Sequence, residues 1–208
     1  MPIKSNYDIQ ADKCKLEFIK MDHKKIAEKF NLEYDEDYLY IYFFSTKYRL
    51  NKRTGHIEKT YDNSNYIPAK FNEIMTLLDV LAYSKEDLSL SGKWINVTNL
   101  KEVFRTGGTV THTDLFAASS KKFSGKTDQL IKACEKLKGR KISQGDVGYI
   151  IDIFDFLPIM FIFYDEDSEF PAECKFLWDE KILNFMHYET TFYVVNYLFE
   201  RLEELIEI

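Results

Sequence analysis

Apolar residues gather in short runs in the second half of the chain, between Tyr149 and Trp178. Isoleucine and phenylalanine dominate these runs, and Pro158 and the acidic residues 165–169 interrupt them. Runs of this length and composition, bounded by turn signals, predict the strands of one β-sheet. Residues 159–164 are apolar throughout. We therefore expect them to form a central strand that is covered on both faces.

The first third of the chain changes from a helical to an extended pattern. Residues 9–30 space their apolar positions as helices do, and Asp22 is placed to cap a second helix that begins at His23. Three segments rich in β-forming residues follow, separated by turn signals: residues 38–43, 47–50 and 56–59. This order predicts two helices and then a three-stranded meander.

Helical spacing returns in four later segments: residues 71–82, 114–120, 127–137 and 189–205. Pro68 favours the start of the first of these helices, and Gly139 favours the end of the third. The sequence thus predicts an α+β fold, with antiparallel strands in one or two sheets and helices packed against them. We expect a single domain over residues 1–208, and two subdomains split near residue 90 are the alternative.

The last helical segment carries one apolar stripe: Phe192, Val195, Phe199, Leu202 and Ile206. A stripe of this kind packs into the core of the same chain or against a partner. We expect core packing first, and a homodimer contact through this helix second.

Composition and net charge exclude some classes of protein. The chain has 208 residues, of which 45% are hydrophobic and 30% charged, so it can bury a core of its own. Its net charge of -6 argues against a nucleic-acid-binding protein, which needs a basic surface. The three cysteines lie far apart, which favours reduced thiols over a disulfide framework. No apolar run approaches the ~20 residues of a membrane span. We therefore expect a soluble cytoplasmic protein with no membrane partner.

The spacing of residues in this chain does not match the known cofactor-binding and metal-binding motifs that it partly resembles. The stretch S-G-K-T at residues 124–127 resembles the tail of a P-loop, but Ser120 stands where that loop needs its first glycine. We interpret the stretch as a turn between two helices. Counted from Asp165, the acidic run has Phe170 and Phe176 where an EF-hand loop needs glycine and glutamate. The sequence predicts no cofactor and gives no firm metal site.

Three residues remain as candidates for a catalytic role. Asp152 interrupts an otherwise apolar strand, where an ionised carboxylate must be paired or reach solvent. His112 lies among threonines, and Arg105 precedes a Gly-Gly turn whose N–H groups can face an anion. A catalytic role requires that the fold brings these three side chains together.

The acidic run Asp165, Glu166, Asp167 and Glu169 places four carboxylates within five residues. The simplest interpretation is a hairpin tip that keeps the sheet edges soluble. The alternative hypothesis is a binding site, because an apolar strand precedes the run and Phe170-Pro171 follows it, which would hold it rigidly. We expect such a site to bind a basic surface of a protein partner or, second, a loosely held divalent cation.

Several segments together resemble one protein family. They are S-G-K-W-I-N-V-T-N-L from Ser91, the Gly145-Asp146 pair, the Leu157-Pro158 step, D-S-E-F-P-A from Asp167, and H-Y-E-T at the entry to the last helix. Their order is similar to that of the anaerobe family catalogued as domain of unknown function 3786, most specifically in D-x-E-F-P-A. The family pattern has a Trp-rich strand where this chain has F-I-F-Y. Some relatives carry clustered cysteines for an iron–sulphur centre, which this chain lacks. The resemblance implies a soluble prokaryotic protein and no established activity.

Two functions compete on this basis. The first is a non-catalytic binding or interaction protein, favoured because no nucleophile–base pair, metal cluster or cofactor loop is recognisable. The alternative is an enzyme or cofactor-handling protein of anaerobic corrinoid or methyl-transfer metabolism, with a site assembled from residues such as Asp152, His112 and Arg105. The sequence leaves open whether the protein is an enzyme.

Overall fold

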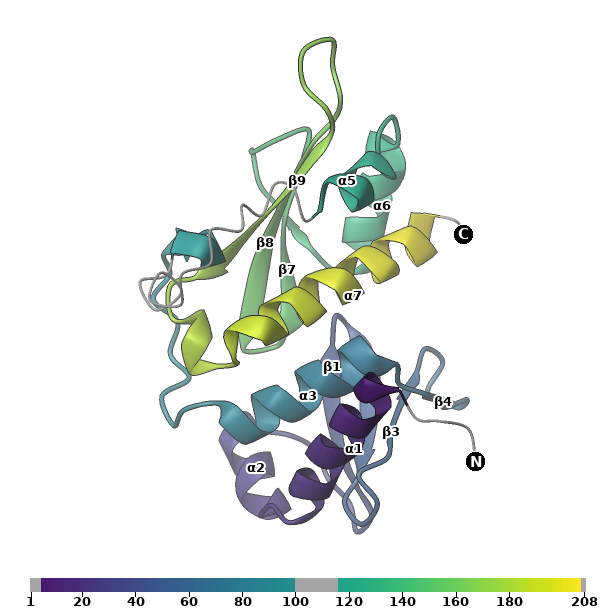
Figure 1. Ribbon diagram of the computed structural model, residues 1–208, viewed down its shortest axis with the longest axis vertical. Helices are drawn as coiled ribbons and strands as arrows, with labels where there is room; N and C mark the ends of the chain where they lie inside the picture. The colour runs from purple at the N-terminus through teal and green to yellow at the C-terminus, as the bar shows by residue number, and fades with distance from the viewer. Residues whose placement is uncertain (1–4, 100–115, 207–208) are drawn as a thin grey trace. The chain divides into compact units, whose positions relative to one another are not determined.

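The computed structural model describes residues 5–99 and 116–206, which divide between two compact units (Figure 1). The first unit holds residues up to Leu88 together with 183–197, and the second holds 89–182 together with the residues from Leu198 onward. Each unit combines helices with its own antiparallel sheet. This confirms the predicted α+β fold.

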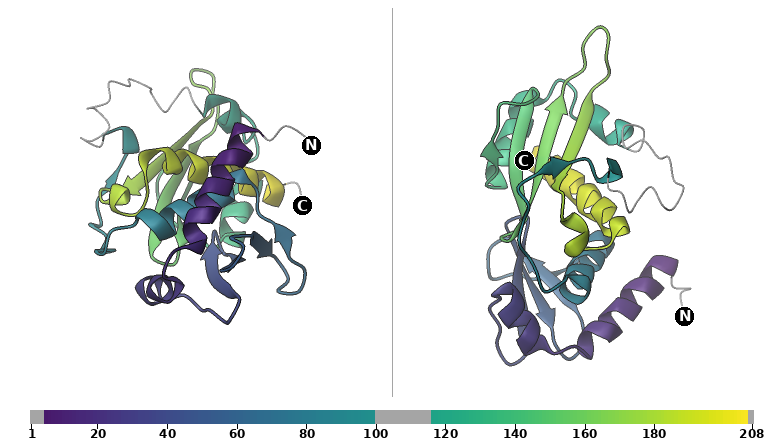
Figure 2. Two further views of the ribbon diagram at one scale, coloured as in Figure 1. Left: turned by 60° about the horizontal axis from the view of Figure 1, so that its bottom comes forward. Right: turned by 90° about the vertical axis from the view of Figure 1, so that its left-hand side faces the viewer.

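In its described residues, the first unit contains three complete helices and a four-stranded sheet. The helices are α1 (Asn6–Ile19), α2 (His23–Phe30) and α3 (Phe71–Tyr83). The strands are β1 (Tyr38–Phe43), β2 (Thr46–Asn51), β3 (Ile57–Thr60) and β4 (Ile67–Pro68), paired in that order. Helices α1 and α3 pack side by side (Figures 1 and 2). The predicted meander is thereby confirmed, with β4 as an edge strand that the sequence did not reveal.

A capping residue explains where α2 begins, and a proline that was expected to start a helix lies in a strand. Asp22 accepts hydrogen bonds from the N–H groups of Lys24 and Lys25, so the predicted cap of α2 is confirmed. The prediction that Pro68 starts the next helix is wrong, because Pro68 pairs with Glu58 in the sheet. An edge strand tolerates proline, which has no N–H to donate.

A fully buried ion pair lies between the sheet and α3. Lys59 Nζ is 2.6 Å from Glu73 Oε1, and the two side chains are 3% and 0% exposed. The Tyr48 hydroxyl also donates to Glu73 Oε1, and it lies 2.7 Å from the Tyr197 hydroxyl. The second carboxylate oxygen accepts from the backbone N–H of Lys70, which fixes the start of α3. Burial lowers the pKa of Lys59, but its bond to Glu73 outweighs this and holds that pKa above its usual value.

Within residues 89–99 and 116–182, the second unit has a five-stranded sheet. Its strands are β5 (Trp94–Ile95), β6 (Arg140–Lys141), β7 (Val147–Phe154), β8 (Leu157–Tyr164) and β9 (Glu173–Asp179). They pair in the order β5-β9-β8-β7-β6. Its other elements are α5 (Ala117–Lys121), α6 (Thr127–Lys136) and the 3₁₀ turn η1 (Val97–Asn99). The 3₁₀ turn η3 (Ile182–Asn184) and α7 (Tyr188–Ile206) end the chain, and both supply residues to both units.

Strand β8 occupies the middle of this sheet, as predicted. Its two alternating sets of side chains are both buried, the first being Ile159, Phe161 and Phe163 and the second Met160 and Ile162. A side chain at Gly145, in the turn before β7, would lie 2.6 Å from Ile162, and the φ of this glycine is +70°. Glycine is therefore required where the chain enters the sheet.

Aromatic rings fill the space between the sheet and α7. Phe199 stacks on Phe123 at 5.9 Å between ring centroids and meets the edge of Phe176 at 5.3 Å. Phe123 in turn contacts Phe163 of β8. Most of the predicted apolar stripe of α7 is buried, with Val195, Phe199 and Leu202 at most 3% exposed. This agrees with core packing, and the homodimer contact stays a prediction.

A buried carboxylate closes the other end of the second unit. Asp179 is 3% exposed and accepts hydrogen bonds from the N–H groups of Ser91, Gly92 and Lys181 at 2.8–3.0 Å, and from the Ser91 hydroxyl. Burial raises the pKa of Asp179, but these hydrogen bonds outweigh it and hold that pKa below its usual value. The start of the resembling segment S-G-K-W is thus tied to the end of β9. In the described part of the chain, no helix has both the length and the apolar character to cross a lipid bilayer.

We expect Phe199→Ala to lower the free energy of unfolding by about 3–5 kcal/mol, because the ring is buried among other rings and its loss leaves a cavity. Asn196→Ala, an exposed change on the same helix, should stay within about 0.5 kcal/mol. Denaturant unfolding followed by circular dichroism measures both. Equal effects of the two substitutions would contradict the buried placement of α7.

We expect Lys59→Met to cost about 3–5 kcal/mol, because it leaves the buried carboxylate of Glu73 without its counter-charge. Adding Glu73→Gln removes that uncompensated charge, so the double variant should recover part of the loss. Lys24→Met, at an ammonium that is 73% exposed, is the control. A double variant no more stable than Lys59→Met would show that the charge of Glu73 is not what the lysine compensates.

Candidate functional site

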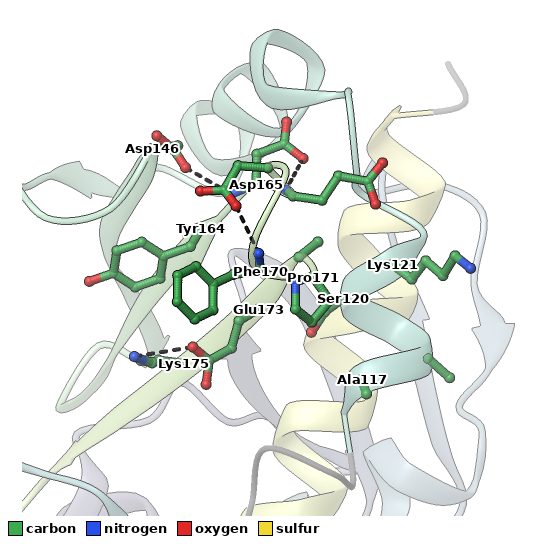
Figure 3. Close-up of a pocket in the computed structure, with 14 residues that line it drawn as sticks. Ala117, Ser120, Lys121, Asp146, Tyr164, Asp165, Phe170, Pro171, Glu173 and Lys175 are labelled. Carbon is green, nitrogen blue, oxygen red and sulfur yellow. Dashed lines mark hydrogen bonds and ion pairs between the residues drawn. The ribbon is translucent and has the colours of Figure 1, made fainter.

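The acidic run lies in the turn between β8 and β9, which projects beyond the ends of the neighbouring strands (Figures 1 and 2). We call residues 165–172 the tip. A cavity of about 820 Å³ lies between the tip and α5 (Figure 3). We call it the tip pocket. Its size falls within the range of ligand-binding pockets.

Three structural parts line the tip pocket. From α5 come Ala117, Ala118, Ser120 and Lys121; from the tip come Asp165, Glu166, Asp167, Phe170, Pro171 and Ala172; and from the strands and the turn before β7 come Asp146, Tyr164, Glu173 and Lys175. Figure 3 shows Lys121 and Ala117 on one side and Phe170, Tyr164 and Lys175 on the other. The lining is therefore mixed, with apolar, acidic and basic side chains.

The outer part of the tip is held by Asp167. Its Oδ1 accepts hydrogen bonds from the N–H groups of Glu169 at 2.7 Å and Phe170 at 2.8 Å. These bonds hold the pKa of Asp167 below its usual value. The N–H of Asp167 donates to the carbonyl oxygen of Phe170, which completes a tight turn. Phe170 is 67% exposed at the wall of the pocket.

The inner part of the tip is held by Asp165. Its carboxylate accepts hydrogen bonds from the Ser124 hydroxyl, the Gly125 N–H and the Thr127 hydroxyl, each at 3.1 Å. The N–H of Glu166 adds a bond of 2.8 Å. Burial raises the pKa of Asp165, but the hydrogen bonds outweigh it and hold that pKa below its usual value. We call residues 124–127 the cradle.

The cradle is the S-G-K-T stretch that resembles the tail of a P-loop. The prediction that it is a turn between two helices is confirmed, because α5 ends at Lys121 and α6 begins at Thr127. The sequence did not reveal that its N–H and hydroxyl groups bind an anion supplied by the same chain. The signal was present as Ser, Gly and Thr at a helix start, but the carboxylate lies about 40 residues away along the chain.

Charges around the tip pocket are only partly paired. Glu173 pairs with Lys175 at 3.1 Å, and Lys175 also lies over the Tyr164 ring at 4.9 Å. Neither of these two contacts includes Glu166 or Lys121, which also line the pocket, and Glu166 is exposed. Five carboxylates and two ammonium groups line the pocket, so its field attracts a cation.

Metal binding at the tip has less support from the geometry. Within residues 5–99 and 116–206, no group of three or more His, Cys, Asp or Glu side chains is arranged to hold a metal ion. Both oxygens of Asp165 accept hydrogen bonds from the cradle, and Oδ1 of Asp167 accepts two from the turn. The arrangement therefore favours a basic partner over a divalent cation.

Asp152 lies in a surface ion pair. Its two oxygens accept hydrogen bonds from both terminal nitrogens of Arg140 at 2.7 and 2.8 Å, and its side chain is 40% exposed. Arg105 and His112 lie outside the described residues. Their convergence with Asp152 therefore stays a prediction.

A second polar cluster, which sequence reasoning missed, lies in the first unit. Asp79 of α3 accepts hydrogen bonds from the His187 N–H at 2.9 Å and from the Thr190 hydroxyl at 2.6 Å. The Nδ1 atom of His187 is 2.6 Å from the other oxygen. The His187 ring also packs on Tyr83, with 3.7 Å between centroids. Asp79 thereby caps the start of α7, since these donors stand at its first turn.

Comparison with known proteins gave one family. A family model described as a domain of unknown function (DUF3786) matches residues 22–201. No curated protein and no solved structure matches the chain.

We expect Asp152→Asn to change the free energy of unfolding by about 1 kcal/mol or less, because its ion pair with Arg140 is largely exposed to water. Asp179→Asn is the contrasting variant, because that carboxylate is buried and its loss should cost about 1–3 kcal/mol. Chemical denaturation compares them. A loss at Asp152 as large as that at Asp179 would overturn its assignment as a surface ion pair.

Proposed function

The chain belongs to the family described as a domain of unknown function (DUF3786), and we propose that it is a non-catalytic binding protein whose tip pocket takes a basic segment of a protein partner. The observation that supports this most is the coincidence of the acidic run with the tip pocket. Acidic residues that only solubilise a hairpin have no need of a cavity beside them.

Exposed apolar surface favours a protein segment over a free cation. Phe170 is 67% exposed and stands beside Pro171, while Ala117 and Ala118 line the opposite wall. A partner that covers this surface removes it from water, which contributes roughly 25 cal/mol per Å² of apolar area. Aromatic side chains such as that of Phe170 are enriched at protein interfaces.

Charge favours a basic segment. The carboxylate of Glu166 stands at the pocket beside those of Asp165 and Asp167. Lysine or arginine on the partner would therefore meet complementary charge, which raises the association rate at low salt. A net charge of -6 for the whole chain acts in the same direction.

The alternative of an enzyme or cofactor-handling protein has less support. Of its three residues, Asp152 is paired with Arg140 at the surface, and it does not line the tip pocket. A cytoplasmic location and an anaerobic prokaryotic source stay predictions that follow from the cysteine pattern and the resemblance.

The proposal predicts selective binding of a basic peptide. The probe is a short synthetic peptide that alternates lysine and phenylalanine, and its counterpart has glutamate in place of lysine. The basic peptide should shift the amide resonances of Glu166, Phe170 and Lys121 in heteronuclear NMR, and the affinity should fall as salt rises. Phe170→Ala combined with Glu166→Gln should weaken binding about tenfold, because an aromatic contact and a charge are lost.

Leu16→Ala is the matched control, since Leu16 of α1 is 57% exposed and lies outside the tip pocket. It should bind the basic peptide as the parent does. Equal binding of the acidic and basic peptides, or shifts spread over residues remote from the tip, would exclude the tip pocket as a site for basic segments.

A further inference from the structure

We propose that Asp165 is a latch, meaning that its contact with the cradle holds the tip in the arrangement that forms the pocket. The inference concerns the regulation of the proposed site, and its consequence for binding rests on the proposed function. The latch itself is inferred from hydrogen bonds within the chain, so it can be tested without a ligand.

The latch joins two walls of the tip pocket that are distant in sequence. Asp165 directly follows β8, while the cradle lies between α5 and α6. Lys121, a lining residue, ends α5 three residues before the cradle begins. Fixing Asp165 to the cradle therefore fixes the spacing between the tip and the helix that faces it across the cavity.

The contact needs a carboxylate. Three donors of the cradle and the N–H of Glu166 converge on two oxygens. An asparagine has one oxygen and would turn an amide group toward these donors. The cradle also stands at the start of the ten-residue helix α6, where the helix dipole favours a negative charge. The N–H of Gly125 donates to both oxygens at 3.1 Å, and the φ of +69° at this position favours glycine.

A second contact holds the backbone of the same residue. The N–H of Asp165 donates to Asp146 Oδ2 at 2.7 Å, so Asp165 is held through both its side chain and its main chain. Other charged groups close by in the chain are Lys126 within the cradle and Glu166 on the tip. From residue 166 to residue 171 the side chains of the tip are exposed, and the turn around Asp167 holds this part locally, while Ala172 is buried. Release of the latch would thus free the tip while the sheet stays paired.

The test is hydrogen exchange on the full chain without any ligand. In Asp165→Asn, the amides of Gly125, Glu166 and neighbouring tip residues should exchange about tenfold faster or more, because hydrogen bonds to a charged acceptor are lost. Exchange in the centre of β8 should stay unchanged. Glu166→Gln is the matched control, since it removes an adjacent exposed carboxylate and should leave exchange at Gly125 as in the parent.

Thr127→Val provides an independent arm from the other side of the contact, because it removes one donor of the cradle and keeps Asp165. It should accelerate exchange at the same amides by a smaller factor, and it keeps the test valid if Asp165→Asn folds poorly. Unchanged exchange at the tip in Asp165→Asn, or in Thr127→Val where the former does not fold, would overturn the latch.

Binding of the lysine–phenylalanine peptide then separates the two proposals. If the parent binds and Asp165→Asn binds at least about tenfold more weakly, with faster exchange at the tip, both stand. If exchange becomes faster but the parent never binds the peptide, the latch stands and the proposed function fails. If the parent binds and exchange is unchanged in the variants, the function stands and the latch is wrong.

Discussion

The first unit depends on one carboxylate that cannot reach water. Glu73 is fully buried, and a buried charge is costly unless it is paired with an opposite charge and hydrogen-bonded. Its donors come from different elements: Lys59 from β3, Tyr48 from β2 and the N–H of Lys70 at the start of α3. Tyr197 of α7 joins through the Tyr48 hydroxyl. One side chain thereby connects a sheet with two helices. A shift of β3 relative to α3 would leave a buried charge without its partner.

The local pattern was enough to predict most elements. The apolar run around Ile159 specified the central strand, and Asp22 specified the start of α2, because burial and capping act over a few neighbouring residues. The polar core was not predictable in this way. Glu73 reads as an ordinary helix residue, and Tyr48 and Tyr197 are 149 positions apart. Only the folded chain shows that such residues meet.

The candidate site was predictable to the same extent. The acidic run from Asp165 can be recognised from its composition. The tip pocket beside it cannot be recognised from the sequence, because α5 and the tip are separated along the chain. The cradle was recognised for its resemblance to a phosphate-binding loop and set aside for a missing glycine. Its chemistry is nonetheless anion binding, since the N–H of Gly125 and the hydroxyl of Thr127 face a carboxylate. A stretch can thus lack the full phosphate-binding motif and still bind an anion through its N–H and hydroxyl groups.

The helix α7 has a consequence for how the protein is made. Its residues up to Tyr197 belong to the first unit and those from Leu198 to the second, so neither unit is one continuous stretch of chain. During synthesis both sheets can pair before α7 leaves the ribosome, but the rings that pack on α7, such as Phe43 on Tyr197 and Phe176 on Phe199, lack these partners until that helix arrives. Because α7 follows both sheets in the chain, its arrival shortens the time for which these rings are exposed and the chain is most prone to aggregate.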